Sequence, residues 1–235
     1  MTVVALIPAR NEAERIDATV RAAREVESVD AVIVVDDAST DETAALAGEA
    51  GALVVRLGNN LGKGGALEAG LAAAGKPDVL LLLDADLGET AGQAGRLLGP
   101  VLAGTADMSI ARFPRPAGKA GFGLVKGLAR WGIRLLGGPF DAQAPLSGQR
   151  ALNLRALDAC RPFESGYGVE VALTVRALRA GLRVTEVDTT MSHAATGRDV
   201  AGFVHRGRQF AHVASALLRV ALERRKKVRH SGQGA

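Results

Sequence analysis

Four short apolar runs, each followed by a helical pattern, constrain the fold more than any other feature of this 235-residue sequence. The runs are VVALI (3–7), AVIVV (31–35), ALVVRL (52–57) and VLLLL (79–83), and the segments between them carry apolar residues at helical spacing. Strands that are apolar throughout are buried on both faces, which is typical of a parallel sheet covered by helices. The sequence therefore predicts an α/β fold with a mostly parallel central sheet flanked by helices.

The second half of the chain is less regular, but no repeat or low-complexity linker separates it from the first. Its pattern predicts strands at 108–112 and 182–188, a basic amphipathic helix within 113–140, and a helix over 166–181. We therefore expect a single domain over residues 1–235. It consists of a Rossmann-like half (1–112), a second half (113–222) and a basic tail (223–235).

Composition narrows the classes of partner. The formal net charge is +4, and residues 223–230, with five Lys or Arg and one Glu, supply all of it. Only 3% of the residues are aromatic, and nucleic-acid binders usually spread basic charge over a face with interleaved aromatics, so nucleic acid is not an expected partner. The tail is either a solvated helix end or a contact with an anionic membrane surface, because segment 203–222 before it has amphipathic spacing.

The cellular compartment is predicted from the cysteine content and the N-terminus. A single cysteine, Cys160, fits a reducing compartment. The first apolar run is only as long as a strand, so we expect neither a signal peptide nor a membrane span. These features predict a cytoplasmic protein, with peripheral contact at the inner face of a membrane left open. The sequence also leaves open a homodimer.

Polar clusters follow three of the predicted strands. They are Pro8, Ala9, Arg10 and Glu12 after the first strand, Asp36 and Asp37 after the second, and Asp84, Ala85 and Asp86 after the fourth. Ligands of open α/β sheets bind outside the carboxyl ends of the strands. We therefore expect the three clusters to converge on one crevice.

Asp84 and Asp86 flank a single alanine, so on an extended backbone their carboxylates point the same way. Two like charges on one face repel each other unless a cation lies between them. Mg²⁺ or Mn²⁺ held by carboxylate and diphosphate oxygens would supply that cation. The alternative is a solvated turn, which is common for this pattern but less so at the end of a buried strand.

Two further motifs allow both a functional and a structural interpretation. In DDAST (36–40), Ser39 or Thr40 fits a helix N-cap, while a preceding carboxylate can accept a hydrogen bond from a nucleobase or ribose. NNLGKGGAL (59–67) lacks the spacing of a P-loop, so Lys63 is a candidate phosphate contact beside glycines that allow tight packing. The first strand is not followed by G-x-G-x-x-G, which disfavours a dehydrogenase.

In this order, LIPARNE, VVDDAST, NLGKGGALEAGL and LLLLDADL resemble the nucleotide-sugar-binding half of GT-A fold glycosyltransferases, particularly family 2. The resemblance implies a nucleoside diphosphate sugar donor, a divalent metal, and an acceptor half in residues 113–222. By position, Pro8, Arg10 and Glu12 would border the nucleobase. Asp37 would accept from the base or ribose, Asp84 would face the ribose, and Asp86 would bind the metal.

The second half is similar to enzymes of the glucosyl-3-phosphoglycerate and mannosylglycerate synthase type. The similarity lies in PLSGQRAL, GYGVEVAL, a late histidine and the GKG at 62–64. It implies that Lys63 contacts donor phosphate, Glu170 lies near the sugar and His193 completes the metal site. The chain departs from these enzymes at GFGLVKG (121–127), where Leu124 and Lys126 stand in place of an Arg and a Thr. An anionic small acceptor loses a partner there. The same segment holds the only Trp, with Lys126, Arg130 and Arg134 on an opposite face, so it is either an interfacial helix that serves a lipid-linked acceptor or a partly buried lid helix.

The sequence thus predicts a metal-dependent glycosyltransferase that moves a hexose from a donor of the UDP-glucose type to a small or lipid-linked acceptor. Asp86, Glu170 and Lys63 are its predicted catalytic residues. If the reaction inverts configuration, Glu170 or Glu89 is the candidate base. The alternatives are a sugar nucleotidyltransferase and a polyprenyl-phosphate sugar transferase that uses GDP-mannose or UDP-glucose.

Overall fold

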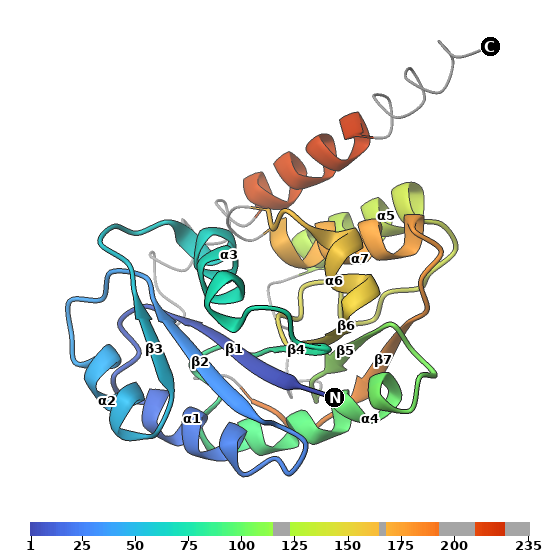
Figure 1. The fold of residues 1–235 in the computed structure, drawn as a ribbon. Helices are drawn as coiled ribbons and strands as arrows, with labels where there is room; N and C mark the ends of the chain where they lie inside the picture. The colour runs from blue at the N-terminus through green and yellow to red at the C-terminus, as the bar shows by residue number, and fades with distance from the viewer. Residues whose placement is uncertain (115–122, 165–167, 193–209, 224–235) are drawn as a thin grey trace.

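The computed structural model describes residues 1–114, 123–164, 168–192 and 210–223. Within these ranges one seven-stranded sheet has the order β3-β2-β1-β4-β6-β5-β7 (Figure 1). The strands are β1 (Val3–Ala9), β2 (Ala31–Asp36), β3 (Leu53–Arg56), β4 (Val79–Leu82), β5 (Met108–Arg112), β6 (Arg150–Asn153) and β7 (Val184–Asp188). All neighbouring strands are parallel except β6, which runs antiparallel to both β4 and β5. The predicted α/β fold with a mostly parallel sheet is confirmed.

Helices cover both faces of the sheet. The helices are α1 (Ile16–Arg24), α2 (Thr43–Glu49), α3 (Gly62–Ala74), the 3₁₀ helix η1 (Gly88–Ala94), α4 (Gly95–Leu102), α5 (Gly123–Gly137), α6 (Leu154–Cys160), α7 (Val169–Arg179) and a C-terminal helix over 210–223. One face is covered by α1, α2, η1 and α4, and the other by α3, α6 and α7 (Figure 1). Side chains of β1 alternate between these two cores, with Ala5 and Ile7 in one and Val4 and Leu6 in the other. This is why the strand is apolar throughout.

A third apolar core joins α5, α7 and the C-terminal helix beside the sheet. Val125 and Ile133 of α5 pack there with Val171 of α7 and with Val213 and Leu217 of the C-terminal helix, all of them buried. A Cβ added to Gly132 would lie 2.4 Å from the Leu217 Cδ2 atom. Glycine at that position therefore lets α5 and the C-terminal helix pack in direct contact.

The antiparallel strand β6 determines what lies beside the end of β4. Leu82, the last residue of β4, is paired with Arg150, the first residue of β6. Because the two strands run in opposite directions, the residues before β6 lie next to those after β4. The loop that ends at Gln149 is thereby placed against Asp84.

Candidate active site

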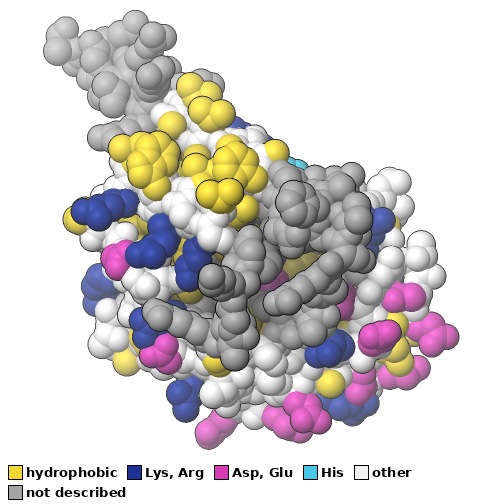
Figure 2. Space-filling model, turned by 180° about the vertical axis from the view of Figure 1, so that it is seen from behind, with side chains coloured by type: hydrophobic (Ala, Val, Ile, Leu, Met, Phe, Trp, Pro, Cys, Tyr) yellow, Lys and Arg dark blue, Asp and Glu magenta, His cyan; other side chains and the backbone are white. Residues whose placement is uncertain are grey.

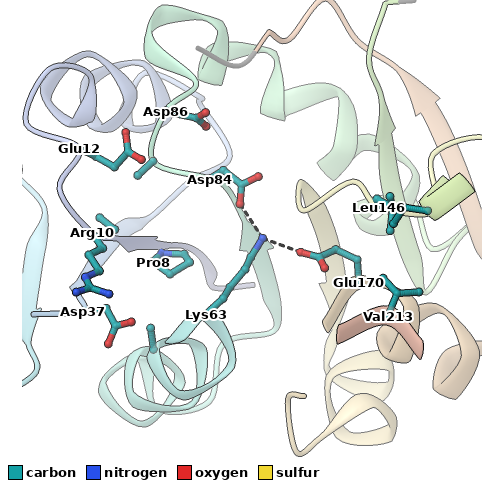
Figure 3. Close-up of a pocket in the computed structure, with 14 residues that line it drawn as sticks. Pro8, Arg10, Glu12, Asp37, Lys63, Asp84, Asp86, Leu146, Glu170 and Val213 are labelled. Carbon is teal, nitrogen blue, oxygen red and sulfur yellow. Dashed lines mark hydrogen bonds and ion pairs between the residues drawn. The ribbon is translucent and has the colours of Figure 1, made fainter. Parts of the chain in front are cut away.

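The three polar clusters at the strand ends converge on one cavity, as expected for the carboxyl edge of a parallel sheet. The cavity has a volume of about 500 Å³ (Figure 3). Its lining consists of Pro8, Ala9, Arg10, Glu12, Asp37, Lys63, Ala66, Asp84, Ala85, Asp86, Val125, Leu146, Glu170 and Val213. Of the predicted site residues, Asp36 does not line the cavity and His193 lies outside the described residues. The alternative base Glu89 is exposed on η1 and does not line the cavity either.

Lys63 joins two carboxylates from opposite sides of the cavity. Its Nζ lies 2.8 Å from Asp84 Oδ1 and 2.8 Å from Glu170 Oε1 (Figure 3). Lys63 comes from the first turn of α3 and Glu170 from the first turn of α7, so this ion pair connects the two halves of the chain. Burial opposes the charge of the ammonium, but the two carboxylates outweigh this effect and raise the pKa of Lys63. Lys63 therefore acts as a fixed positive charge and not as a base.

Gln149 binds the second carboxylate oxygen of Asp84. The Gln149 side chain is fully buried, and its Nε2 donates a hydrogen bond of 2.6 Å to Asp84 Oδ2. The other oxygen of Asp84 accepts from Lys63. Both carboxylate oxygens are therefore held, and the rotamer of Asp84 is set by one residue from each half of the chain.

Thr19 of α1 holds the turn that carries Asp84 and Asp86. Thr19 is fully buried, and its hydroxyl donates to the carbonyl of Ala85 and accepts from the amide of Gly88, both at 2.8 Å. Gly88 has a φ of 54°, a left-handed conformation that favours glycine. This clamp orients Asp84 and Asp86 on either side of a buried Ala85.

Asp36 is the last residue of β2 and Asp37 follows it, but the two differ in their surroundings. Asp37 lines the cavity and accepts from the amides of Leu61 and Gly62 at 2.7 and 2.9 Å, which anchors the glycine-rich loop before α3. Asp36 is buried and accepts from the Ser39 amide instead. Donor binding by Asp37 stays a prediction. Asp36 instead stabilises the loop between β2 and α2 through its hydrogen bond with the Ser39 amide.

The interpretation of DDAST as an N-cap is wrong. The helix α2 begins at Thr43, and its N-cap residue Glu42 makes no side-chain cap. The Ser39 hydroxyl accepts from the Asn11 amide at 3.0 Å, and the Thr40 amide donates to Asn11 Oδ1 at 2.9 Å. The serine and threonine therefore tie this loop to the end of β1, because the polar partners of Asn11 lie there and the helix starts three residues later.

Glu12 lies at the acidic end of the cavity (Figure 3). Burial raises its pKa from 4.5 to about 7, and the negative charges of Asp86, Asp41 and Asp84 add to this effect. A carboxyl group gains protons when like charges surround it without enough positive charge. This part of the cavity therefore favours a cation.

The sequence profile of Glycosyl transferase family 2 matches residues 4–135, which is more than half of the chain. The chain belongs to glycosyl transferase family 2. The predicted enzyme class, a glycosyltransferase, is confirmed, and these comparisons favour sugar transfer over the nucleotidyltransferase alternative.

Two family 2 relatives are similar over most of this chain. Glycosyltransferase AglJ of Haloferax volcanii is 31% identical over 202 residues, which cover 83% of this chain. The chain spans only 64% of the length of AglJ. The undecaprenyl-phosphate mannosyltransferase of Micrococcus luteus is 33% identical over 208 residues, which cover 81% of this chain and 83% of the relative.

Solved structures of one further enzyme share the fold. Glucosyl-3-phosphoglycerate synthase from Mycobacterium tuberculosis, in complex with Mn²⁺, UDP and phosphoglyceric acid, has a TM-score of 0.77 and 27% sequence identity. The similarity covers 93% of this chain and 78% of that chain. The GT-A fold implied by the sequence motifs is thereby confirmed.

The acidic end of this family 2 site fits Mg²⁺ or Mn²⁺ by its chemistry. Oxygen ligands suit these ions, and Mg²⁺ is usually held by one or two carboxylates together with substrate phosphates. Within the described ranges, no three His, Cys, Asp or Glu side chains are grouped so that they could hold a metal by themselves. The protein would therefore contribute Asp86 and share the ion with a diphosphate. Asp86 and His193 as metal ligands stay predictions.

Replacing Glu12 by glutamine is expected to stabilise the metal-free protein at about pH 8 by about 1–2 kcal/mol, after allowance for its partial exposure. The raised pKa means that ionising Glu12 costs stability in the folded state. This cost is absent below pH 4.5, grows as the pH rises, and is complete above about pH 7. The stabilising effect of Glu12→Gln should therefore grow over the same window.

Urea unfolding in a chelator at about pH 5 and about pH 8 measures this difference. Glu14→Gln, at an exposed position two residues further along, controls for the loss of a carboxylate. Equal stability changes for Glu12→Gln at both pH values would show that the charges around Glu12 do not act as described.

Proposed function

We propose that this family 2 glycosyltransferase transfers a hexose from a nucleoside diphosphate sugar of the UDP-glucose type to a hydroxyl or phosphate group of an acceptor, with Mg²⁺ or Mn²⁺. The observation that carries the proposal is the single cavity in which Asp86 and Asp84 lie with Lys63 and Glu170 (Figure 3). The glucosyl-3-phosphoglycerate synthase complexes with Mn²⁺ and UDP-glucose support this choice of donor and metal.

The donor would occupy the side of the cavity formed by the ends of β1, β2 and β4. Arg10 and Asp37 border that side, where a nucleobase and ribose would lie (Figure 3). Asp84 would face the ribose, and Asp86 would face the diphosphate. A bound divalent ion supplies positive charge that stabilises the diphosphate as it leaves.

The acceptor would enter from the other side, where Glu170 lies with Val125, Leu146 and Val213. Glu170 would take the acceptor proton if the reaction inverts configuration. Lys63 would hold Glu170 in position from the donor side and present its charge to the donor phosphates. The ion pair Asp84–Lys63–Glu170 would thus couple donor binding to the orientation of the acceptor base.

The test is nucleotide release from a panel of donors, chiefly UDP-glucose and GDP-mannose, with Mn²⁺ and with chelator. We expect slow UDP release by hydrolysis without an acceptor, faster release with a suitable acceptor, and none in chelator. Incubation with CTP, Mg²⁺ and sugar phosphates serves as the nucleotidyltransferase control. Failure to release a nucleoside diphosphate from any donor, or equal release in chelator, would contradict the proposal.

A further inference from the structure

The largest exposed apolar side chains gather on two neighbouring helices. In the described ranges, ten large apolar side chains are exposed, and six of them lie on α5 or the C-terminal helix. Leu124, at 84% exposure, is the most exposed of the ten, and Trp131 on the same helix is 61% exposed. Leu135 follows on α5, and Leu218 and Leu222 lie on the C-terminal helix. An apolar cluster of this kind on a surface indicates a contact with another molecule or a membrane.

The exposed residues of α5 form two adjacent stripes. Leu124, Trp131 and Leu135 recur at i, i+7 and i+11, so they share one face of the helix. Lys126, Arg130 and Arg134 recur at i, i+4 and i+8, and all three are exposed. Figure 2 shows apolar side chains grouped where the C-terminal helix leaves the body, with Lys and Arg side chains beside them.

We call these eight residues the docking surface: Leu124, Trp131, Leu135, Leu218 and Leu222, with Lys126, Arg130 and Arg134. The direct packing of α5 on the C-terminal helix at Gly132 brings both parts of the surface together. Arg130 also forms an exposed ion pair of 2.7 Å with Asp141. Such a pair is weak in water and leaves the guanidinium available to an anionic surface.

The same two helices also line the cavity through other side chains. Val125 is next to Leu124 on α5 and lies about 100° further around the helix, and Val213 lies five residues before Leu218 on the C-terminal helix; both valines line the cavity. The two helices that carry the docking surface therefore also form part of the cavity wall. A layer that covered the docking surface would lie beside the acceptor side of the site.

We propose that the docking surface binds an anionic membrane, with the leucines and Trp131 in the headgroup boundary and the three cations against lipid phosphates. Tryptophan is enriched at such boundaries, and lysine and arginine extend their charges toward headgroups there. In the described ranges no helix is long and apolar enough to cross a bilayer.

Charge favours a membrane over a second copy of the chain. A symmetric dimer would place the same patch of both protomers face to face. The basic stripe of Lys126, Arg130 and Arg134 would then lie against or near the same stripe of the other protomer, and like charges across an interface are costly. An anionic bilayer pairs with all three at once. In the sequence, residues 224–229 add five more Lys or Arg.

One consequence rests on the proposed function. A membrane at the docking surface would present a lipid-linked phosphate or hydroxyl to the apolar acceptor side of the cavity, at Val125, Leu146 and Val213. The acceptor class would then be a lipid carrier and not a free metabolite.

The experiment uses the full chain and two kinds of vesicle, phosphatidylcholine alone and phosphatidylcholine with an equal part of phosphatidylglycerol. Trp131 is the only tryptophan of the chain, so its emission reports on this surface directly. We expect the emission to shift to shorter wavelength, and the protein to sediment, with the anionic vesicles only. Lys126→Gln/Arg130→Gln/Arg134→Gln should weaken binding about a hundredfold at low salt. Leu124→Ser/Leu135→Ser should weaken it by about tenfold or more.

Leu53→Ser is the matched control, because Leu53 is 57% exposed, close to the 58% of Leu135, but lies on the edge strand β3. It should bind vesicles like the unmodified chain. Unchanged Trp131 emission with anionic vesicles would overturn the proposal. So would an emission that shifts with protein concentration alone together with a dimer in sedimentation, because the surface would then be covered by a second copy. Metal-dependent UDP release without vesicles is measured in parallel, so failure of docking is distinguished from failure of the proposed function.

Discussion

Asp86→Asn is expected to lower metal-dependent UDP release and sugar transfer by at least about a thousandfold, because charge stabilisation by a metal contributes several kcal/mol to such a reaction. Asparagine has nearly the same size as aspartate, so the cavity keeps its shape and only the negative charge is lost. Asp86 follows the buried Ala85, which Thr19 holds through its carbonyl. The substituted side chain therefore stays in place without the charge that would bind the ion.

Two measurements accompany this substitution. Calorimetric titration of Mn²⁺ in the presence of UDP should show weaker binding for Asp86→Asn, and thermal unfolding should show an unchanged fold. Glu89→Gln is the control, because it removes an exposed carboxylate three residues away that does not line the cavity. Turnover near that of the unmodified enzyme would refute the role of Asp86 at the metal.

Lys63→Met is expected to impair both stability and turnover. Without the ammonium, Asp84 and Glu170 face each other with no cation between them. Removing one partner from a buried ion pair costs about 3–5 kcal/mol, and because Lys63 and Asp84 are each about a quarter exposed, we expect about 2 kcal/mol here. Turnover should fall by at least about a hundredfold, because the positive charge that we propose Lys63 presents to the donor phosphates is lost.

A double-mutant cycle separates the two effects. Glu170→Gln in the Lys63→Met background removes one of the two repelling carboxylates, so part of the lost stability should return while turnover stays low. Lys63→Arg keeps the charge with a different shape and should retain most of the stability. If Lys63→Met unfolds at the same urea concentration as the unmodified chain, the Asp84–Lys63–Glu170 ion pair does not stabilise the free enzyme.

Strands β1, β2 and β4 could be predicted from the sequence because they are largely buried on both faces, whereas β3 is an edge strand whose Leu53 is exposed. Runs such as VLLLL between helical patterns favour a covered strand, and the polar residues that follow parallel strands then meet at one edge of the sheet. This reasoning was sufficient to place Glu12, Asp37, Asp84 and Asp86 in one cavity. Asp36 was the exception, because it is the last residue of β2 and its side chain points away from that of Asp37, toward the Ser39 amide.

Strand β6 was not predicted, because it begins with a buried arginine and is only four residues long. Arg150 can be buried because its guanidinium donates hydrogen bonds to the Ser147 carbonyl and the Thr174 hydroxyl. A pattern of apolar residues in the sequence does not reveal these partners. Gln149 and Thr19 were missed because each supports the site through a contact more than sixty residues away in the sequence. For Gln149 a signal existed, since the segment PLSGQRAL resembles that of related enzymes.

The reversed direction of β6 has a consequence for how new acceptor specificities can arise in this fold. The described residues of 113–149 leave the sheet after β5 and return beside β4, where Gln149 donates to Asp84, Gly148 lies against Lys63 and Asp84, and Arg150, which follows, pairs with Leu82. Chimaeras that exchange this excursion between family members, and that keep these contacts, should retain the nucleotide binding that we propose while the preferred acceptor changes. The acceptor specificity of such an enzyme can therefore change in evolution while the residues proposed to bind the donor stay the same.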